Sequence, residues 1–287
     1  MNIEITSFLD NDSETFTYVV EDKASSKAVI IDPVLDFDYS AGRVHTASAQ
    51  KIANFVDERG LSFEWVLETH VHADHLSAAP YLHERLGGKT GIGEKIAVVQ
   101  EVFGKAFNAG TDFARDGSQF DRLFKEGDTF MIGNLEASVL HTPGHTPACL
   151  TYIIGDAAFV GDTLFAPDAG TARCDFPGGD AHTLYHSIQK VLALPVETRV
   201  FLCHDYKAAG RDEFIHETTI AEQRSSNIHV GKGISEDQFV AFRSERDAKL
   251  GMPRLILPAV QVNMRAGQLP PSEDNGQVYL KIPLNRF

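Results

Sequence analysis

The chain has 287 residues, 43% of them hydrophobic, and a formal net charge of −14 at pH 7. This length allows a large core, as one domain or as a domain with an appendage, and the acidic balance argues against nucleic acid as a partner. The longest apolar runs are far shorter than the roughly 20 residues that span a bilayer, so we expect no membrane segment.

Short apolar segments bounded by turn residues predict strands, and apolar residues at helical spacing predict helices between them. The predicted strands are 16–20, 28–31, 63–68, several between 124 and 165, and 198–203. The predicted helices are 47–59, 76–86, 181–194, 212–223 and 235–250. We interpret residues 34–44 as a loop and the last segment, after the predicted helix 235–250, as irregular. Residues 87–119 have no pattern that indicates a role. This order favours α/β or α+β layers over a parallel barrel.

The most informative motif follows the predicted strand 63–68. It reads His70-Val71-His72-Ala73-Asp74-His75, with four potential metal ligands within six residues. A strand that ends in a loop of imidazoles and a carboxylate places several donors in one small volume, which is typical of a metal site. The alternative is a polar turn that is rich in histidine by chance, and the spacing makes this the weaker interpretation.

Three further donors lie where a predicted strand gives way to a loop. His145 follows the turn Pro143-Gly144, Asp162 follows a glycine, and His204 ends the last predicted strand. Taken singly, each is more typical of an ordinary turn. Because strand ends meet at one edge of a sheet, the ordered set predicts that these donors join the first cluster.

The order His-x-His-x-Asp-His, Gly-His, Gly-Asp and a late His resembles the metallo-β-lactamase superfamily. The resemblance implies an αββα sandwich with a metal site at one edge between two sheets, here over residues 1–225. Residues 226–287 are then a C-terminal helical extension packed on the same domain. In two-metal members, one ion is bound by the positions matching His70, His72 and His145, and the other by those matching Asp74, His75 and His204, with Asp162 bridging.

A narrower resemblance concerns the loops that carry these donors. The chain is similar to the persulfide dioxygenase branch in four segments, and its longer tail after residue 210 resembles the bacterial members more than the mitochondrial ones. The four segments are Thr-Pro-Gly-His-Thr-Pro-Ala-Cys at 142–149, Gly-Asp-Thr-Leu-Phe at 161–165, Gly-Thr-Ala-Arg-Cys-Asp-Phe at 170–176 and His-Asp-Tyr at 204–206. The helix predicted at 181–194 adds to the resemblance.

That branch implies a non-haem iron(II) dioxygenase that oxidises glutathione persulfide with O2 and water to sulfite and glutathione, a step of sulfide detoxification. One Fe(2+) per chain is bound there by the positions matching His70, His145 and Asp162. Two imidazoles and one carboxylate leave three positions on iron(II) for water, oxygen and substrate, whereas zinc activates water but not dioxygen. The remaining donors then orient the first ligands or form a second metal site; they are His72, Asp74, His75 and His204.

We expect further roles for residues beside the metal. Asp74 and Tyr206 are candidate catalytic residues, and Tyr206 is also placed to hydrogen-bond the substrate. Arg173 is a candidate for binding a substrate carboxylate, because a guanidinium forms a bidentate fork. An ion pair of Arg173 with Asp175 is an equally good interpretation, and Tyr206 has a purely packing role as its alternative.

The three cysteines are too few and too scattered for a disulfide framework. Cys149 and Cys203 lie in apolar runs and are predicted to be buried, whereas Cys174 lies in a polar loop. We expect none of them to be a catalytic thiol. The N-terminal residues show no secretory pattern, so we expect a cytoplasmic protein.

The nearest alternative function is a glyoxalase-II-like hydrolase of glutathione thioesters with two Zn(2+) ions, which uses the same metal positions. A metal or sulfide sensor without catalysis is a further alternative. The sequence leaves open whether the carrier thiol is glutathione, coenzyme A or another small thiol. The extension either covers the active site, mediates a homodimer, or does both.

Overall fold

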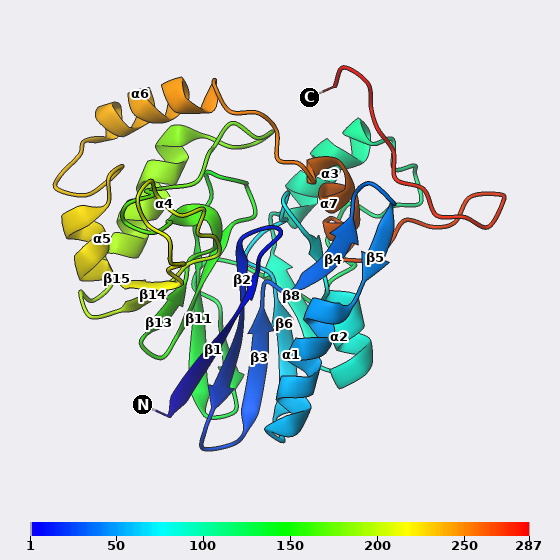
Figure 1. The fold of residues 1–287 in the computed structure, drawn as a ribbon, viewed down its shortest axis with the longest axis horizontal. Coiled ribbons are helices and arrows are strands. Elements are labelled where there is room, and N and C mark those ends of the chain that lie inside the picture. The colour runs from blue at the N-terminus through cyan, green and yellow to red at the C-terminus, as the bar shows by residue number, and fades with distance from the viewer. Residues whose placement is uncertain (1, 287) are drawn as a thin grey trace.

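The computed structural model describes residues 2–286, which form two six-stranded sheets stacked face to face, with helices on both outer faces (Figure 1). The first sheet has the order β1-β2-β3-β6-β8-β9, and the second has the order β10-β11-β12-β13-β14-β15. A third, small sheet has the order β5-β4-β7. The predicted αββα sandwich is therefore confirmed.

In the first sheet β1, β2 and β3 are antiparallel to one another in turn, and β3, β6, β8 and β9 are parallel. Its strands are β1 (Ile3–Asp10), β2 (Thr15–Asp22), β3 (Lys27–Ile31), β6 (Ser62–Leu67), β8 (Lys89–Gly93) and β9 (Arg122–Phe124). The small sheet contains β4 (Val34–Asp38), β5 (Arg43–His45) and β7 (Leu76–Ser77). Two helices cover the outer face of the first sheet: α1 (Ala47–Glu58) and α2 (Ala79–Leu86).

The second sheet is antiparallel except for one parallel pair, β13 with β14. Its strands are β10 (Thr129–Ile132), β11 (Leu135–His141), β12 (Leu150–Ile154), β13 (Ala157–Phe159), β14 (Arg199–Phe201) and β15 (Glu217–Thr219). Its outer face packs against α4 (Ala181–Leu192), α5 (Ile220–Ser226) and α6 (Glu236–Asp247). The two remaining α-helices, α3 (Ile96–Ala106) and α7 (Ile256–Asn263), lie side by side (Figure 1). Both contribute residues to one apolar cluster.

The alternation of side chains along the strands explains the layers. In β3, Val29 and Ile31 point between the two sheets, whereas Ala28 and Ile30 pack beneath the helices. Both faces of this strand are therefore buried, which is why it reads as a continuous apolar run. The space between the sheets is filled mainly by aromatic and branched residues, among them Trp65, Phe124, Tyr152 and Phe201.

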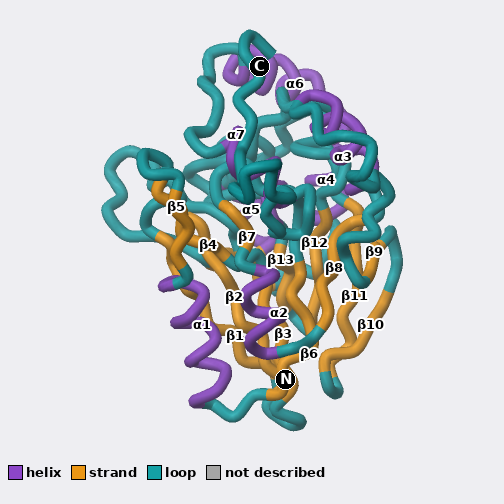
Figure 2. Tube along the Cα trace, turned by 90° about the vertical axis from the view of Figure 1, so that its right-hand side faces the viewer, coloured by secondary structure: helices purple, strands orange, loops and turns teal. Residues whose placement is uncertain are grey.

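The parallel pairs bring the functional loops to one edge of the sandwich. Ile31 of β3 lies opposite Leu67 of β6, and Phe159 of β13 lies opposite Phe201 of β14. Each pair of strands therefore ends at the same level, and the loops that follow them emerge together. In Figure 2 these loops lie above the strands, on the side that α6 and α7 cover.

Several elements differ from the sequence-based expectation. The predicted loop 34–44 contains β4 and part of β5, because β4 pairs with β7. The helix predicted at 212–223 is wrong at its start: residues 217–219 form β15, and α5 begins only at Ile220 behind a capping box of Thr219 and Glu222. The segment judged irregular contains α7, and β1 and α3 were not predicted.

Among the described residues, no helix is long and apolar enough to cross a membrane.

Candidate metal centre

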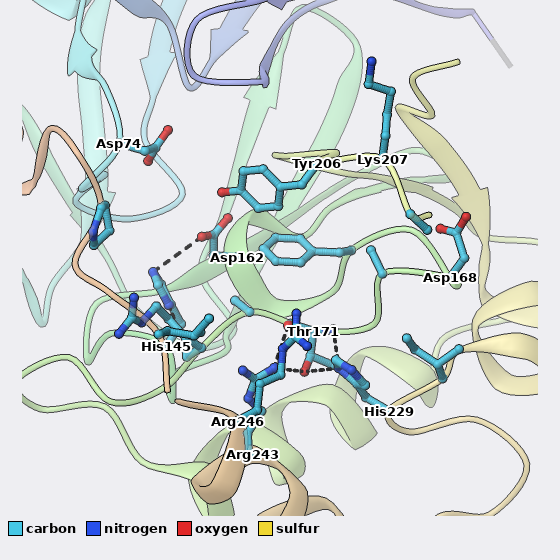
Figure 3. Close-up of a pocket in the computed structure, with 18 of the residues that line it drawn as sticks. Asp74, His145, Asp162, Asp168, Thr171, Tyr206, Lys207, His229, Arg243 and Arg246 are labelled. Atoms are coloured by element: carbon cyan, nitrogen blue, oxygen red, sulfur yellow. Dashed lines mark hydrogen bonds and ion pairs between the residues drawn. The ribbon is translucent and has the colours of Figure 1, made fainter. Parts of the chain in front are cut away.

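Two histidines and one carboxylate converge at the edge of the sandwich as predicted. His70 follows β6, His145 follows β11, and Asp162 lies in the short 3-10 helix Gly161–Thr163 behind β13. Asp162 Oδ2 lies 3.5 Å from His145 Nε2 and 3.9 Å from His70 Nε2. One ligand atom from each of the three lies within 4.8 Å of the others, and all three residues are buried. Figure 3 shows the Asp162 carboxylate facing the ring of His145.

The remaining donors lie directly beside this trio. His204 Nε2 is 3.5 Å from Asp74 Oδ2 and 3.5 Å from Asp162 Oδ1. His72, Asp74 and His75 form a second group with ligand atoms within 4.8 Å of one another. The structure therefore brings together all seven donors that the sequence singled out.

Hydrogen bonds at Nδ1 fix which nitrogen of each imidazole faces the cavity. His145 Nδ1 lies 2.7 Å from the carbonyl oxygen of Arg173, and His75 Nδ1 lies 3.0 Å from that of Leu76. A carbonyl can only accept, so both rings carry hydrogen on Nδ1 and leave Nε2 free. This arrangement is typical of metal-binding histidines, whose second nitrogen is held by the protein.

Two threonines hold the other rings in the same way. The Thr69 hydroxyl donates to Asp32 at 2.7 Å, so it accepts from His70 Nδ1 at 3.0 Å. The Thr15 hydroxyl donates to Asp74 at 3.0 Å and lies 3.2 Å from His204 Nδ1. His70 and His204 thereby also present Nε2 to the cavity.

Buried atoms without partners indicate that the donors fit a metal ion. Buried polar atoms are almost always hydrogen-bonded, because an unsatisfied one costs about 1–3 kcal/mol. Within residues 2–286, six polar atoms at this site have no hydrogen-bond partner: Glu68 Oε2, His72 Nδ1 and Nε2, His75 Nε2, Asp162 Oδ1 and His204 Nε2. Glu68 Oε2 and His72 Nε2 lie 3.4 Å apart, within ion-pair distance of each other. The other four atoms belong to the predicted ligand set, and a bound cation would supply the missing interaction.

Burial also keeps two of these rings in the neutral form that binds metals. Burial, followed by the charges of neighbouring imidazoles, lowers the pKa of His70 well below its usual value and lowers that of His75 to about 4. His204 differs: burial opposes protonation, but Cys203, Asp74 and Asp162 raise its pKa. A cation held by His204 and these carboxylates would take the place of that proton.

His72 is held differently from the other histidines. Its Nε2 lies 3.0 Å from Asp32 Oδ1 and 3.4 Å from Glu68 Oε2, and both carboxylates are buried. Burial would lower the pKa of His72, but the Asp32 carboxylate raises it above the usual value. Only Nδ1 of His72 is therefore available to a metal.

A cavity of about 600 Å³ opens from the metal ligands toward the C-terminal part of the chain. Asp74, His145 and Asp162 line one end, and Tyr206 lies beside them with its hydroxyl directed toward the two carboxylates (Figure 3). The Tyr206 ring stacks on His204 at 5.5 Å between ring centres. Desolvation, then Asp162 and Asp74, raises the pKa of Tyr206, so its hydroxyl stays protonated.

Arg173 lines this cavity, but its guanidinium is already bound. Nε and Nη2 each lie 2.6 Å from a carboxylate oxygen of Asp175, and Nη1 donates to the carbonyl of Gly251 at 2.6 Å. This is the ion pair considered as the alternative to substrate binding. Two other cations that line the cavity, Arg246 and Lys207, have no carboxylate partner within the described part of the chain.

The cysteines are buried, including Cys174, which the sequence placed in a polar loop. Its backbone N–H donates to Asp247 at 2.9 Å, which draws this loop beneath α6. Burial raises the pKa of Cys149 and Cys174 to about 12 and also raises that of Cys203. Their thiols therefore stay protonated at neutral pH.

Sequence reasoning missed the residues that support the ligands from a distance. Thr15, Asp32 and Thr69 hold the histidine rings, and Asn263 of α7 binds the loop of the first motif. Arg243 of α6 is buried and pairs with Asp247. Asp32 and Thr69 sit at strand ends beside the motif, a signal that could have identified them, but nothing local indicates Thr15, Arg243 or Asn263.

Comparison with known proteins gives a consistent family assignment. The model of the Metallo-beta-lactamase superfamily matches residues 11–204. A probable metallo-hydrolase of Burkholderia pseudomallei is 54% identical over 98% of this chain and 99% of its own length. Glyoxylase B2 of Dictyostelium discoideum is 49% identical over 98% of this chain and 97% of its own length.

Persulfide dioxygenases are also similar to the chain. The mitochondrial persulfide dioxygenase ETHE1 of Bos taurus is 32% identical over 90% of this chain and 87% of its own length. The crystal structure of ETHE1 from Myxococcus xanthus superposes with a TM-score of 0.73 at 33% identity, covering 92% of this chain and all of that one. The resemblance to this branch, predicted from four loop segments, is therefore confirmed.

Proposed function

Because this chain belongs to the metallo-beta-lactamase superfamily and its relatives include persulfide dioxygenases, we propose that it is a non-haem iron(II) persulfide dioxygenase. In the proposed reaction, glutathione persulfide, O2 and water give sulfite and glutathione. The observation that carries the proposal is the convergence of His70, His145 and Asp162, with ligand atoms within 4.8 Å of one another. Two imidazoles and one carboxylate form a donor set suited to iron(II) that leaves positions open.

The residues around this trio have roles that follow from their contacts. Iron(II), when bound, supplies the electron transfer to O2 that no side chain here provides. Asp74 accepts a hydrogen bond from Thr15, and nearby imidazoles lower its pKa against the effect of burial, so it stays ionised. It is therefore able to orient water for cleavage of the S–S bond. The protonated Tyr206 hydroxyl is a donor for the persulfide sulfur.

The opposite end of the cavity supports an anionic carrier thiol. The chain as a whole repels anions, since its net charge is −14. Arg246 provides local positive charge in the cavity wall and has no ion-pair partner among the described residues, whereas the ammonium of Lys207 lies over the ring of Phe214. Glutathione carries two carboxylates and fits this pattern. A substrate role for Arg173 stays a prediction, because a carboxylate that binds there has to displace Asp175.

A second candidate is the hydrolysis of a glutathione thioester by two zinc ions. The unpartnered Nε2 atoms of His75 and His204 favour it, because they form a second group of donors next to Asp162. The relatives named as a metallo-hydrolase and a glyoxylase are also more similar in sequence than the dioxygenases. Both candidates use the same cavity for the carrier, so the metal and the reaction separate them.

The test loads the metal-free protein anaerobically with iron(II) or zinc(II) and assays both forms side by side. One assay measures sulfite formed from glutathione persulfide in the presence of O2, and the other measures cleavage of a glutathione thioester. The proposal predicts sulfite from the iron form and little cleavage by the zinc form. Thioester cleavage by the zinc form, without sulfite from the iron form, identifies the hydrolase instead.

A further inference from the structure

His229 is a buried polar residue of the cavity wall, away from the metal ligands. It follows α5, in the segment that leads to α6, and its exposed fraction is 5%. The backbone N–H of Thr171 donates to His229 Nδ1 at 2.9 Å, and the Thr171 hydroxyl lies 3.1 Å from the same atom. Within residues 2–286, these are the hydrogen bonds of its ring.

The hydrogen bond from Thr171 fixes the tautomer of the ring. A backbone N–H can only donate, so Nδ1 must be the acceptor and the ring hydrogen must sit on Nε2. Burial, followed by the charges of Arg243 and Arg246, lowers the pKa of His229 to about 4, so the ring is neutral at pH 7. Nε2–H is thus a donor without a protein acceptor in the part of the chain that is described.

The surroundings also hold the ring in one orientation. Gly170 has φ +90°, and a Cβ built there would lie 2.2 Å from His229 Nδ1, so glycine is needed for the ring to approach. The ring of Phe242 packs on the other side, with 4.4 Å between ring centres. A donor that the protein holds in place in this way loses little entropy when it binds.

The charges beside His229 indicate what it binds. Arg243 is occupied, since it pairs with Asp247 and donates to the carbonyl of Thr171 at 3.0 Å. Arg246, one turn further along α6, lines the same cavity without a carboxylate partner among the described residues (Figure 3). The groups left over are a neutral N–H donor and a guanidinium, and both select an anion that accepts hydrogen bonds.

We propose that His229 is a ligand-binding residue whose Nε2–H donates to a carboxylate of the carrier thiol, beside Arg246. The inference rests on the proposed function only in taking glutathione as the carrier. It assigns to the segment between α5 and α6 a part in choosing the substrate. Coenzyme A, which carries phosphates in place of carboxylates, provides the comparison.

The test measures the dissociation constant of glutathione by calorimetry on the iron-loaded protein without O2. A hydrogen bond to a charged group contributes about 1.5–3 kcal/mol, so we expect His229→Ala to weaken binding roughly 10- to 100-fold. His229→Gln places an N–H near the position of Nε2 and is expected to restore most of the affinity. His229→Asn places an oxygen near Nδ1, keeps the acceptor for Thr171, and is expected to bind as weakly as alanine.

The two amide variants separate ligand binding from a structural role, even if the alanine variant fails to fold. If His229→Asn restores glutathione binding and His229→Gln does not, the role of His229 is only to accept the hydrogen bond from Thr171. That result overturns the proposal. The exposed His182 of α4 supplies the control, since His182→Ala should bind glutathione as the wild type does. Coenzyme A is expected to bind weakly to the wild type, and an affinity equal to that of glutathione also contradicts the proposal.

This measurement does not depend on turnover. If glutathione binds through His229 but glutathione persulfide yields no sulfite, the proposed reaction fails and the binding site stands. If sulfite forms normally and His229→Ala leaves glutathione binding unchanged, the site fails and the reaction stands.

Discussion

The side-chain amide of Asn263 in α7 donates to the backbone carbonyl of His72 at 2.9 Å and to that of His75 at 2.8 Å. Its oxygen accepts from the backbone N–H of Ser77 at 2.8 Å. One residue near the C-terminus therefore satisfies three backbone groups of the loop that carries the first metal motif. This contact ties the extension to the metal centre.

The first prediction concerns these three hydrogen bonds of the Asn263 side chain. Asn263→Ala leaves two buried carbonyls and one N–H without a partner, at about 1–3 kcal/mol each. We expect the free energy of unfolding to fall by a few kcal/mol and the iron content of the purified protein to drop. Denaturation and metal analysis measure both. Asn275→Ala, at an exposed site, is the matched control. Equal iron content in the two variants argues against a role of the Asn263 hydrogen bonds in supporting the metal-binding loop.

The second prediction concerns the support of His70. Thr69→Val keeps the shape of the side chain but removes the hydroxyl that links His70 Nδ1 to Asp32. Loss of such a support typically weakens metal binding 10- to 100-fold. Competition with a chelator measures the iron affinity. Thr111→Val, on the exposed surface, should leave the affinity unchanged.

The third prediction concerns the charge at the far end of the cavity. Arg246→Ala removes a cation that, in the proposed complex, contacts the carrier and not the reacting sulfur. We therefore expect KM for glutathione persulfide to rise roughly tenfold while kcat changes little. Steady-state kinetics measure the two constants. Lys249→Ala lies just beyond the same helix and pairs with Glu245, so it serves as the control. A fall in kcat without a change in KM would place Arg246 in the chemistry and not in binding.

The fourth prediction concerns acid stability. The pKa of His229 is about 4 in the folded chain, below the usual 6.5, so the unfolded state binds more protons between these values. The contribution of His229 to the free energy of unfolding is therefore fully present above pH 6.5. It is lost as the pH falls toward 4, by on the order of 3 kcal/mol. Urea unfolding across this range should show a shallower loss in His229→Gln than in the wild type. An identical slope contradicts the prediction, and His83→Gln on α2 is the control.

The metal ligands were predictable because the chemistry is local in sequence. Gly144, at φ +135°, leaves no room for a Cβ against the backbone of Leu184, and it aims His145 into the site. Gly161 has the same function before Asp162, with φ +51° and Thr69 where a Cβ would lie. Short turns of this kind and strand ends can be identified from the residues alone.

The supports of the site were not predictable, because they join distant parts of the chain. Asn263 lies 191 residues from His72, and Thr15 lies 189 residues from His204. α7 was not predicted because seven of its eight residues are buried. A helix buried on all sides lacks the alternation of apolar and polar faces by which a helix is recognised in sequence. β4 was interpreted as a loop because its strand character depends on pairing with β7.

Oxygen uptake by the iron-loaded protein on addition of glutathione persulfide tests the central claim most directly. We predict rapid uptake with one sulfite formed for each O2 consumed, and we predict its loss in Asp162→Ala protein that remains folded by circular dichroism. Absence of uptake in iron-loaded wild-type protein, with thioester cleavage by its zinc form, would contradict the account and assign the seven donors to two zinc ions.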